Sequence, residues 1–270
     1  MIRKIVMTLT LCLFLLGLVS CDTLFSGGKG TLRLSITDAP AVDVDEVWID
    51  FGSVSVSQST DSGAGEDEWT TINEDGGTIN LLALSNGALE DLGVADLAPG
   101  TYNQVRLDVQ GAQVVVNGEE YTATVNSSSI KLVRAFILEA GITTELVADF
   151  NAAHSVKLTG SNSYRINPVV KLTQVNSTGR AIGTVVSPLD VLVTASAYAE
   201  YDAGDETLIP DGGTSIDETG AFILGYLEPG TYDIVIEAEG YEALVFADQT
   251  IVQGETLELG DDISLTPSAK

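Results

Sequence analysis

Leu97-Ala-Pro-Gly-Thr-Tyr102 recurs almost unchanged as Leu227-Glu-Pro-Gly-Thr-Tyr232, and alternating apolar and polar residues follow each copy. Proline followed by glycine is typical of a tight type II turn, in which proline presets its backbone angle and glycine takes a positive one. The tyrosine then begins the outgoing strand, and we expect its ring to lie on a sandwich core. We interpret both copies as structural, because turn chemistry accounts for them fully.

Alternation with a period of two extends through most of the chain, broken by Gly, Asn, Asp and Pro. It is found in Thr31–Ile36, Val47–Phe51, Val54–Val56, Val105–Val109, Val114–Val116, Ile130–Val133, Thr143–Phe150 and Val169–Val175. Such runs predict half-buried antiparallel strands. We expect a bulge at Gly52, an exposed hairpin loop over Asp61–Glu68, and one or two helical turns within Ile79–Leu92.

The ratio of acidic to basic residues changes at Asn176-Ser-Thr-Gly-Arg180, a polar stretch without apolar periodicity. Residues 181–270 hold 18 acidic residues and one base, whereas residues 22–180 hold 21 acidic residues and nine bases. We therefore predict an all-β fold with two antiparallel β-sandwich domains in tandem, at 30–175 and 181–270, with residues 176–180 as the linker. The net charge of −27 argues against nucleic acid as a partner, because phosphate binding needs stripes of lysine and arginine.

The first 20 residues have the layout of a secretory signal peptide: Arg3 and Lys4, then an apolar run from Ile5 to Val19 that is too short to span a membrane. Leu18-Val-Ser-Cys21 resembles the bacterial lipobox. That resemblance implies that Cys21 is acylated, that residues 21–29 form a tether, and that the protein is a membrane-anchored lipoprotein of the cell envelope, periplasmic or surface-exposed. A cleaved signal with a chance cysteine is the alternative, and the choice of membrane stays open.

The second predicted domain contains Asp217-Glu-Thr-Gly-Ala-Phe222, the second copy of the hexapeptide, and Ala238-Glu-Gly-Tyr241. These residues resemble the carboxypeptidase regulatory-like domain over residues 180 to about 266. The resemblance implies a transthyretin-like, or prealbumin-like, two-sheet sandwich. Nothing in the chain resembles a peptidase catalytic domain, so the resemblance implies no peptidase activity.

The first predicted domain contains six characteristic stretches: Leu32–Pro40, Val44–Ile49, Ile79–Leu84, Pro99–Arg106, Asp149–Val156 and Asn167–Val170. Through these residues it resembles the domain-of-unknown-function family 4382 over roughly residues 30–175. The family brings no established activity, so the resemblance defines a fold and not a function.

Catalysis is not expected. His154 is the only histidine, which argues against metal sites and serine relays built on several histidines. Cys12 is removed with the signal peptide and Cys21 is acylated, so neither a nucleophilic cysteine nor a disulfide remains. We interpret His154 as a hydrogen-bonded loop or strand-edge residue, and we predict no cofactor apart from the metal ion considered next.

Calcium is the ion that an acidic chain of this kind is best suited to bind, because calcium prefers oxygen ligands and tolerates irregular loops. Asp38, Asp43 and Asp45 form the candidate site, since acids at a strand end could converge there. The alternative is a solvated acidic loop, because no stretch has the EF-hand pattern.

Carbohydrate is the other candidate ligand, because sandwich modules bind sugars on exposed aromatic rings. The candidates are Trp48, Trp69, Tyr198 and Tyr201, and each could equally cover a sandwich edge. We predict a non-catalytic binding or adhesion module at the cell envelope, with a glycan or an envelope protein as its partner. The alternative is a structural spacer or assembly partner without a small ligand. The sequence leaves the ligand and the oligomeric state open.

Overall fold

Strand β2 (Glu46–Ser57) shows how the alternating sequence sorts side chains between two faces in the computed structural model, which describes residues 28–39, 44–61, 63–160, 163–205 and 207–269. Val47, Ile49 and Phe51 are buried, while Trp48 and Asp50 between them are partly exposed on the opposite face. The pairing register of β2 shifts between Phe51 and Val54, so the bulge predicted at Gly52 is confirmed.

Two sheets enclose the first hydrophobic core and form what we call the N-terminal sandwich (residues 30–174). The smaller sheet has the order β12 (Val170–Gln174), β9 (Thr143–Asn151), β1 (Gly30–Ala39), β5 (Glu90–Leu97). The larger has the order β10 (Val156–Thr159), β11 (Ser163–Ile166), β7 (Glu119–Val125), β6 (Gly100–Val116), β2, β3 (Trp69–Asn73), with β4 (Gly77–Asn80) paired to β2 and β8 (Ser129–Leu138) paired to β6.

Two four-stranded sheets form the C-terminal sandwich (residues 179–264). One contains β16 (Ala221–Leu227), β13 (Gly179–Ser187), β19 (Thr256–Glu258) and β20 (Ile263–Ser264). The other has the order β15 (Gly212–Ser215), β14 (Val193–Tyr198), β17 (Gly230–Ala238), β18 (Leu244–Ile251).

The described helical segments are short: η1 (Glu66–Glu68), η2 (Leu81–Leu84), α2 (Ala152–Ser155) and η3 (Val175–Ser177). The helical turn predicted within Ile79–Leu92 is therefore confined to η2. The loop predicted over Asp61–Glu68 joins β2 to β3 and contains η1. None of the described helices has the length and apolar character that a membrane-spanning segment needs.

The all-β prediction is confirmed, and most pairs of described strands are antiparallel as predicted, but four pairs are parallel. β1 pairs with β9 in parallel from Thr31 to Ala39, and parallel pairs also join β7 to β11 and β13 to both β19 and β20. Parallel partners need long connections between strands, which alternation within one strand does not reveal.

Both copies of the hexapeptide form a corner between the two sheets of a sandwich. The first carries the chain from β5 to β6, and the second carries it from β16 to β17. In each copy the buried tyrosine donates its hydroxyl hydrogen bond to the carbonyl four residues earlier, from Tyr102 to Ala98 and from Tyr232 to Glu228, at 3.0 Å. The positive φ predicted for glycine occurs at Gly100, with φ 150°, and not in the second copy.

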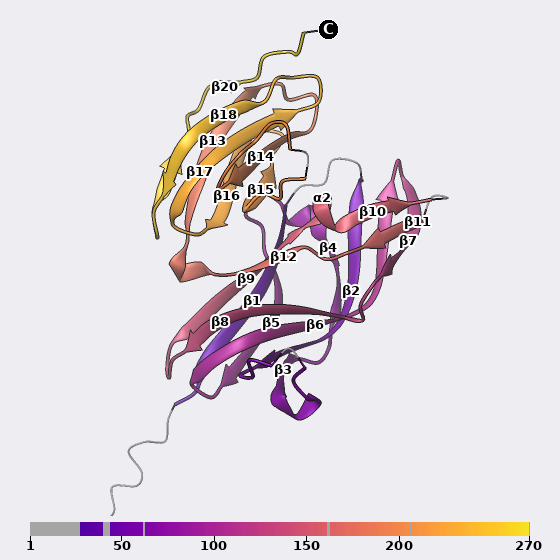
Figure 1. Ribbon diagram of the computed structural model, residues 1–270, viewed down its shortest axis with the longest axis vertical. Helices are drawn as coiled ribbons and strands as arrows, with labels where there is room; N and C mark the ends of the chain where they lie inside the picture. The colour runs from indigo at the N-terminus through magenta and orange to yellow at the C-terminus, as the bar shows by residue number, and fades with distance from the viewer. Residues whose placement is uncertain (1–27, 40–43, 62, 161–162, 206, 270) are drawn as a thin grey trace, which may run out of the picture.

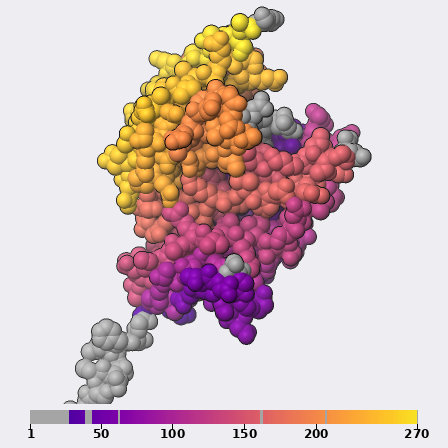
Figure 2. Space-filling model, viewed as in Figure 1, coloured from indigo at the N-terminus to yellow at the C-terminus, as the bar shows by residue number. Residues whose placement is uncertain are grey.

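The hydrophobic residues form two separate cores, one from Leu32 to Leu172 and one from Ala181 to Leu265. The chain passes between them at residues 176–180, and the domain boundary expected there stays a prediction. Figure 1 shows the C-terminal sandwich at the opposite end of the long axis from the start of β1. Figure 2 shows the two sandwiches packed directly against each other.

Candidate functional site

Trp48 lies on β2, on the face opposite the core, in agreement with the alternation over Val47–Phe51. Its indole Nε1 donates a hydrogen bond to the Glu46 carboxylate, and its backbone pairs with Gln113 of β6 and Asn80 of β4. The side chain is half-buried and is not part of the first hydrophobic core as described.

Trp69 begins β3 and lies beneath a cation. The Arg106 guanidinium carbon is 4.6 Å from the centre of its ring, and Lys131 Nζ is 5.6 Å from it. Arg106 also binds both carboxylate oxygens of Glu66 at 2.9 Å, and this hydrogen bonding lowers the pKa of Glu66. Cation–π contacts therefore already engage the Trp69 ring.

Tyr198 and Tyr201 are the only two of the four predicted aromatic residues that the structure brings together within its described part. Their ring centres are 5.2 Å apart and the rings are tilted by 46°. Tyr198 alternates with the core residues Ala195 and Ala197 of β14 and so faces outward, as does Glu237 of β17. Burial raises the pKa of both tyrosines and of Glu237, and the Glu237 charge raises the tyrosine pKa values further.

The acids of the predicted calcium site make separate contacts. Asp38 is buried and its Oδ1 accepts a hydrogen bond from the Ala152 backbone N–H at 3.1 Å, whereas Asp45 Oδ2 accepts one from Gly118 at 2.9 Å. Asp43, like Cys21, lies outside the described residues. Within the described ranges, no three His, Cys, Asp or Glu side chains form a group that could hold a metal ion. Calcium binding stays a prediction.

His154 occupies the short helix α2 at the end of β9. Its backbone N–H and its ring Nδ1 both lie 3.0 Å from Asn151 Oδ1, and burial lowers the pKa of the imidazole. Asn151 caps α2 through this contact. The hydrogen-bonded role expected for His154 agrees with this geometry.

Side chains that the sequence did not single out join the two sandwiches at their junction. Asn86 donates from its backbone to Thr214 Oγ1 at 2.7 Å and from Nδ2 to Asp217 at 3.2 Å, and its Oδ1 accepts from the Ile223 N–H at 2.6 Å. Asn86 holds a positive φ of 59°, which asparagine tolerates better than most residues.

Two ion pairs add to these contacts. Arg134 of β8 pairs with Glu228, the one position at which the two hexapeptides differ. Lys171 Nζ of β12 binds the Asp211 carboxylate and carbonyl, each at 3.1 Å. Because both partners in each pair are about one-third exposed, we assign each pair about 0.2–1 kcal/mol.

A cavity of about 220 Å³ lies beside the Lys171–Asp211 pair and contains a buried acid. Asp149 is the neighbour of Lys171 across the β9–β12 pairing, and within the described residues its Oδ1 is buried without a hydrogen-bond partner. Burial raises the pKa of Asp149 to about 6, and the nearby Lys171 charge limits the rise.

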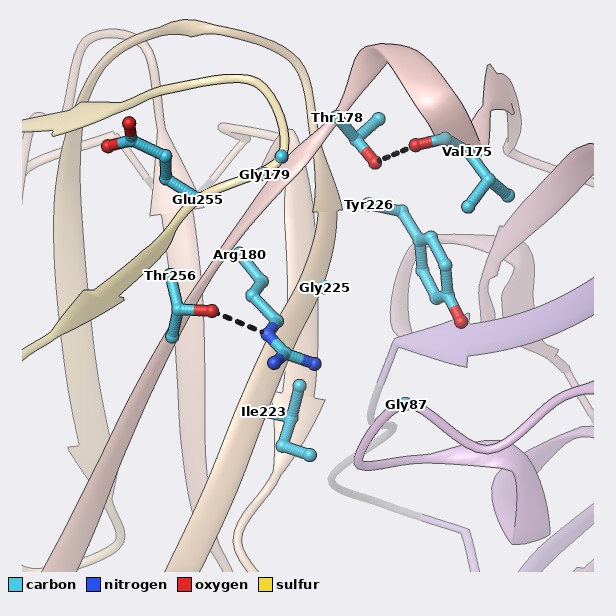
Figure 3. A pocket seen from close by; sticks show the side chains of 11 residues that line it. Gly87, Val175, Thr178, Gly179, Arg180, Ile223, Gly225, Tyr226, Glu255 and Thr256 are labelled. Atoms are coloured by element: carbon cyan, nitrogen blue, oxygen red, sulfur yellow. Dashed lines mark hydrogen bonds between the residues drawn. The ribbon is translucent and has the colours of Figure 1, made fainter.

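A second junction cavity, of about 380 Å³, is lined mainly by the C-terminal sandwich (Figure 3). Its large polar side chains are Arg180, Tyr226 and Glu255, and Gly87 of the N-terminal sandwich also lines it. Sequence reasoning missed this site. The available signal was that Arg180 is the only base between residues 180 and 269.

Comparisons with solved structures give only distant likenesses. The Bacillus anthracis TIE protein is 14% identical with a TM-score of 0.22; the match covers 88% of this chain and 34% of that protein, so the chain spans about a third of its length. The minor pilin GBS52 of Streptococcus agalactiae is also 14% identical, over 88% of this chain and 97% of the pilin, with a TM-score of 0.22. A variant of the shaft pilin SpaA of Lactobacillus rhamnosus GG is 12% identical over 89% and 100%, with a TM-score of 0.22. TM-scores this low carry no argument about function.

The family comparison is informative. No curated protein matches the chain. Residues 29–168, which are more than half of the chain and include most of the N-terminal sandwich, match the model described as a domain of unknown function (DUF4382). The resemblance expected for the first half of the sequence is thus confirmed, and the chain belongs to the DUF4382 family.

Proposed function

We propose that this protein is a lipid-anchored, non-catalytic binding module of the bacterial cell envelope, and that it holds a carbohydrate on the C-terminal sandwich. The observation that carries the proposal is the Tyr198–Tyr201 ring pair beside Glu237, on the side of the sheet turned away from the core.

The chemistry of this patch suits a sugar. Aromatic rings stack against the C–H faces of a sugar ring, and a carboxylate accepts hydrogen bonds from its hydroxyl groups. Neither tyrosine belongs to a hydrophobic core in the described part of the chain, whereas Tyr164, in a similarly tilted pair with Tyr121, packs against the first core. The rings of Tyr198 and Tyr201 therefore lie outside the two hydrophobic cores.

The proposed anchor would place this patch away from the membrane. Acylation at Cys21 would attach the chain just before β1, and the C-terminal sandwich with β14 lies at the far end of the long axis from the start of β1 (Figure 1). We also propose that this sandwich is a carboxypeptidase regulatory-like, transthyretin-like domain, an assignment supported by its two four-stranded sheets.

A glycan array tests the carbohydrate proposal. The protein lacking residues 1–21 is applied first with calcium and then with a chelator. We expect reproducible glycan binding that the double variant Tyr198→Ala/Tyr201→Ala loses. Tyr121→Ala is the matched control, because its ring forms a pair at 5.3 Å tilted by 52° and also lies beside a carboxylate, Glu119. Loss of binding in the chelator would assign a calcium-dependent site, and a blank array under both conditions would exclude the carbohydrate proposal.

The second candidate function is a structural spacer, and the junction favours it. The Asn86 hydrogen bonds and the two ion pairs tie the sandwiches together at three places, as a stiff extended support would need. A blank array together with membrane attachment would favour this function.

Membrane attachment is tested with Cys21→Ala, compared with Ser20→Ala as a control that keeps a small residue before the cysteine. We expect Cys21→Ala to move the protein from the membrane fraction to the soluble fraction. An unchanged membrane fraction would contradict lipid anchoring for both functions.

A further inference from the structure

Arg180 is unusual in its surroundings. It is the only basic residue between positions 180 and 269, a segment that holds 18 acidic residues. It lies on β13 opposite Thr256 of β19, and its Nε donates a hydrogen bond to the Thr256 hydroxyl at 2.8 Å. Among the residues that the structure describes, the two terminal nitrogens of Arg180 make no hydrogen bond and no ion pair.

The exposed Arg180 side chain borders a partly open cavity. The cavity of about 380 Å³ is formed by β13, β16, the loop before β19, η3, and the turn of the N-terminal sandwich that contains Gly87. In Figure 3 the Arg180 guanidinium and the Tyr226 ring lie on opposite sides of this space, with Ile223 and the Gly87 turn below them. The Glu255 carboxylate points away from Arg180 in the same view.

Tyr226 is held in this position by an uncommon backbone conformation. Its φ is 57°, a left-handed value that is rare for a bulky aromatic residue. Burial raises the pKa of its hydroxyl, Glu145 raises it further and Arg180 lowers it, so the guanidinium charge acts across the cavity.

The chemistry of the lining selects a ligand class. An arginine with two free N–H₂ groups matches the two oxygens of a carboxylate, and an aromatic ring with an isoleucine suits an apolar or ring-shaped body. A volume of about 380 Å³ is at the small end of ligand pockets. The net charge of −27 disfavours a polyanion more than a single carboxylate, and the one guanidinium in the lining matches one carboxylate.

We propose that the cavity between Arg180 and Tyr226 binds a small monocarboxylate, with the carboxylate on the Arg180 guanidinium and the body of the ligand against Tyr226 and Ile223. The site is distinct from the Tyr198–Tyr201 patch and does not depend on it. Because Gly87 closes one side, the bound ligand would contact both sandwiches.

Isothermal titration of the purified protein with two acids tests the proposal. Glucuronate represents a sugar acid and phenylacetate an aromatic acid, and glucose is the neutral counterpart of glucuronate. We expect at least one acid to bind and glucose not to bind. Arg180→Gln should weaken the binding by about tenfold or more, because it removes a charged bidentate contact. The relative affinities of the two acids identify the kind of ligand.

Two further variants separate binding from folding. Arg180→Lys keeps the charge and loses the two-pronged geometry, so we expect it to bind more weakly than wild type even when its melting temperature is unchanged. Arg165→Gln, at an exposed arginine of β11, makes the same charge change elsewhere and should bind as wild type does. The proposal is overturned by three results: binding of neither acid, equal binding of glucose, or Arg180 variants that bind like Arg165→Gln.

Discussion

Asp149→Asn should stabilise the protein at neutral pH. The pKa of Asp149 is about 6 in the folded protein, against an ordinary value of 3.8. The pKa of Asp149 is higher in the folded than in the unfolded protein. The contribution of its protonated carboxyl group to the free energy of unfolding is therefore fully present below pH 3.8 and is lost as the pH rises through 6. The complete loss corresponds to about 3 kcal/mol, at about 1.4 kcal/mol for each pKa unit. Asparagine keeps the shape of the side chain and carries no charge to bury.

The measurable part of this effect lies between pH 5 and pH 8, because the protein approaches its isoelectric point of about 4.1 in more acidic solution. Because protonation is coupled to folding, roughly half of the loss of about 3 kcal/mol, about 1.5 kcal/mol, falls in this pH interval. We therefore expect the advantage of Asp149→Asn over wild type in urea denaturation to grow by about 1.5 kcal/mol from pH 5 to pH 8.

Asp217→Asn is the matched control. The pKa of Asp217 is lowered by the hydrogen bond from Thr219, so Asp217 stays ionised throughout this interval, and its substitution should change stability equally at both pH values. A carboxyl titration by NMR would give the pKa of Asp149 directly. A value near 3.8, or an advantage that does not grow with pH, would refute the reasoning.

Three further predictions concern the fold and are measured by urea denaturation. Asn86→Gly keeps the left-handed backbone but loses two side-chain hydrogen bonds across the junction, so it should cost about 1–3 kcal/mol; calorimetry should then show the two sandwiches melting less cooperatively. Tyr102→Phe and Tyr232→Phe should each cost about 1 kcal/mol for the lost hydroxyl hydrogen bond, and the costs should add because the residues lie in different cores. Gly220→Ala should be more destabilising than Gly118→Ala, because both have positive φ but only at Gly220 would the new methyl group meet a carbonyl oxygen, at 1.9 Å. Additive tyrosine costs below about 0.3 kcal/mol, or equal costs at the two glycines, would contradict these arguments.

Local sequence patterns predicted the parts of the fold that depend on neighbours along the chain. The alternation around Trp48 identified the buried and outward faces of β2, and Gly52 marked its bulge. They did not predict that β1 lies parallel to β9, because that pairing joins segments more than 100 residues apart.

The same holds for the candidate sites: features that depend on distant parts of the chain were not predicted. The sequence identified Trp69 as a candidate aromatic residue, but not that Arg106 covers its ring, since Arg106 comes from β6. Asp149 was one acid among 39, and only burial at the junction distinguishes it. Arg180 was also missed, although the rarity of basic residues around it can be read from composition alone.

The two hexapeptides show that the shared residues of a repeat can be explained from local sequence, whereas the position at which the copies differ cannot. Five of the six positions are identical, and they form the same corner with the same tyrosine-to-carbonyl hydrogen bond. The position that differs is Ala98 in one copy and Glu228 in the other, and turn chemistry makes no demand on it. In the folded chain Glu228 pairs with Arg134 of the other sandwich. The five identical residues thus form a corner in each sandwich, and the single difference contributes to joining the two sandwiches.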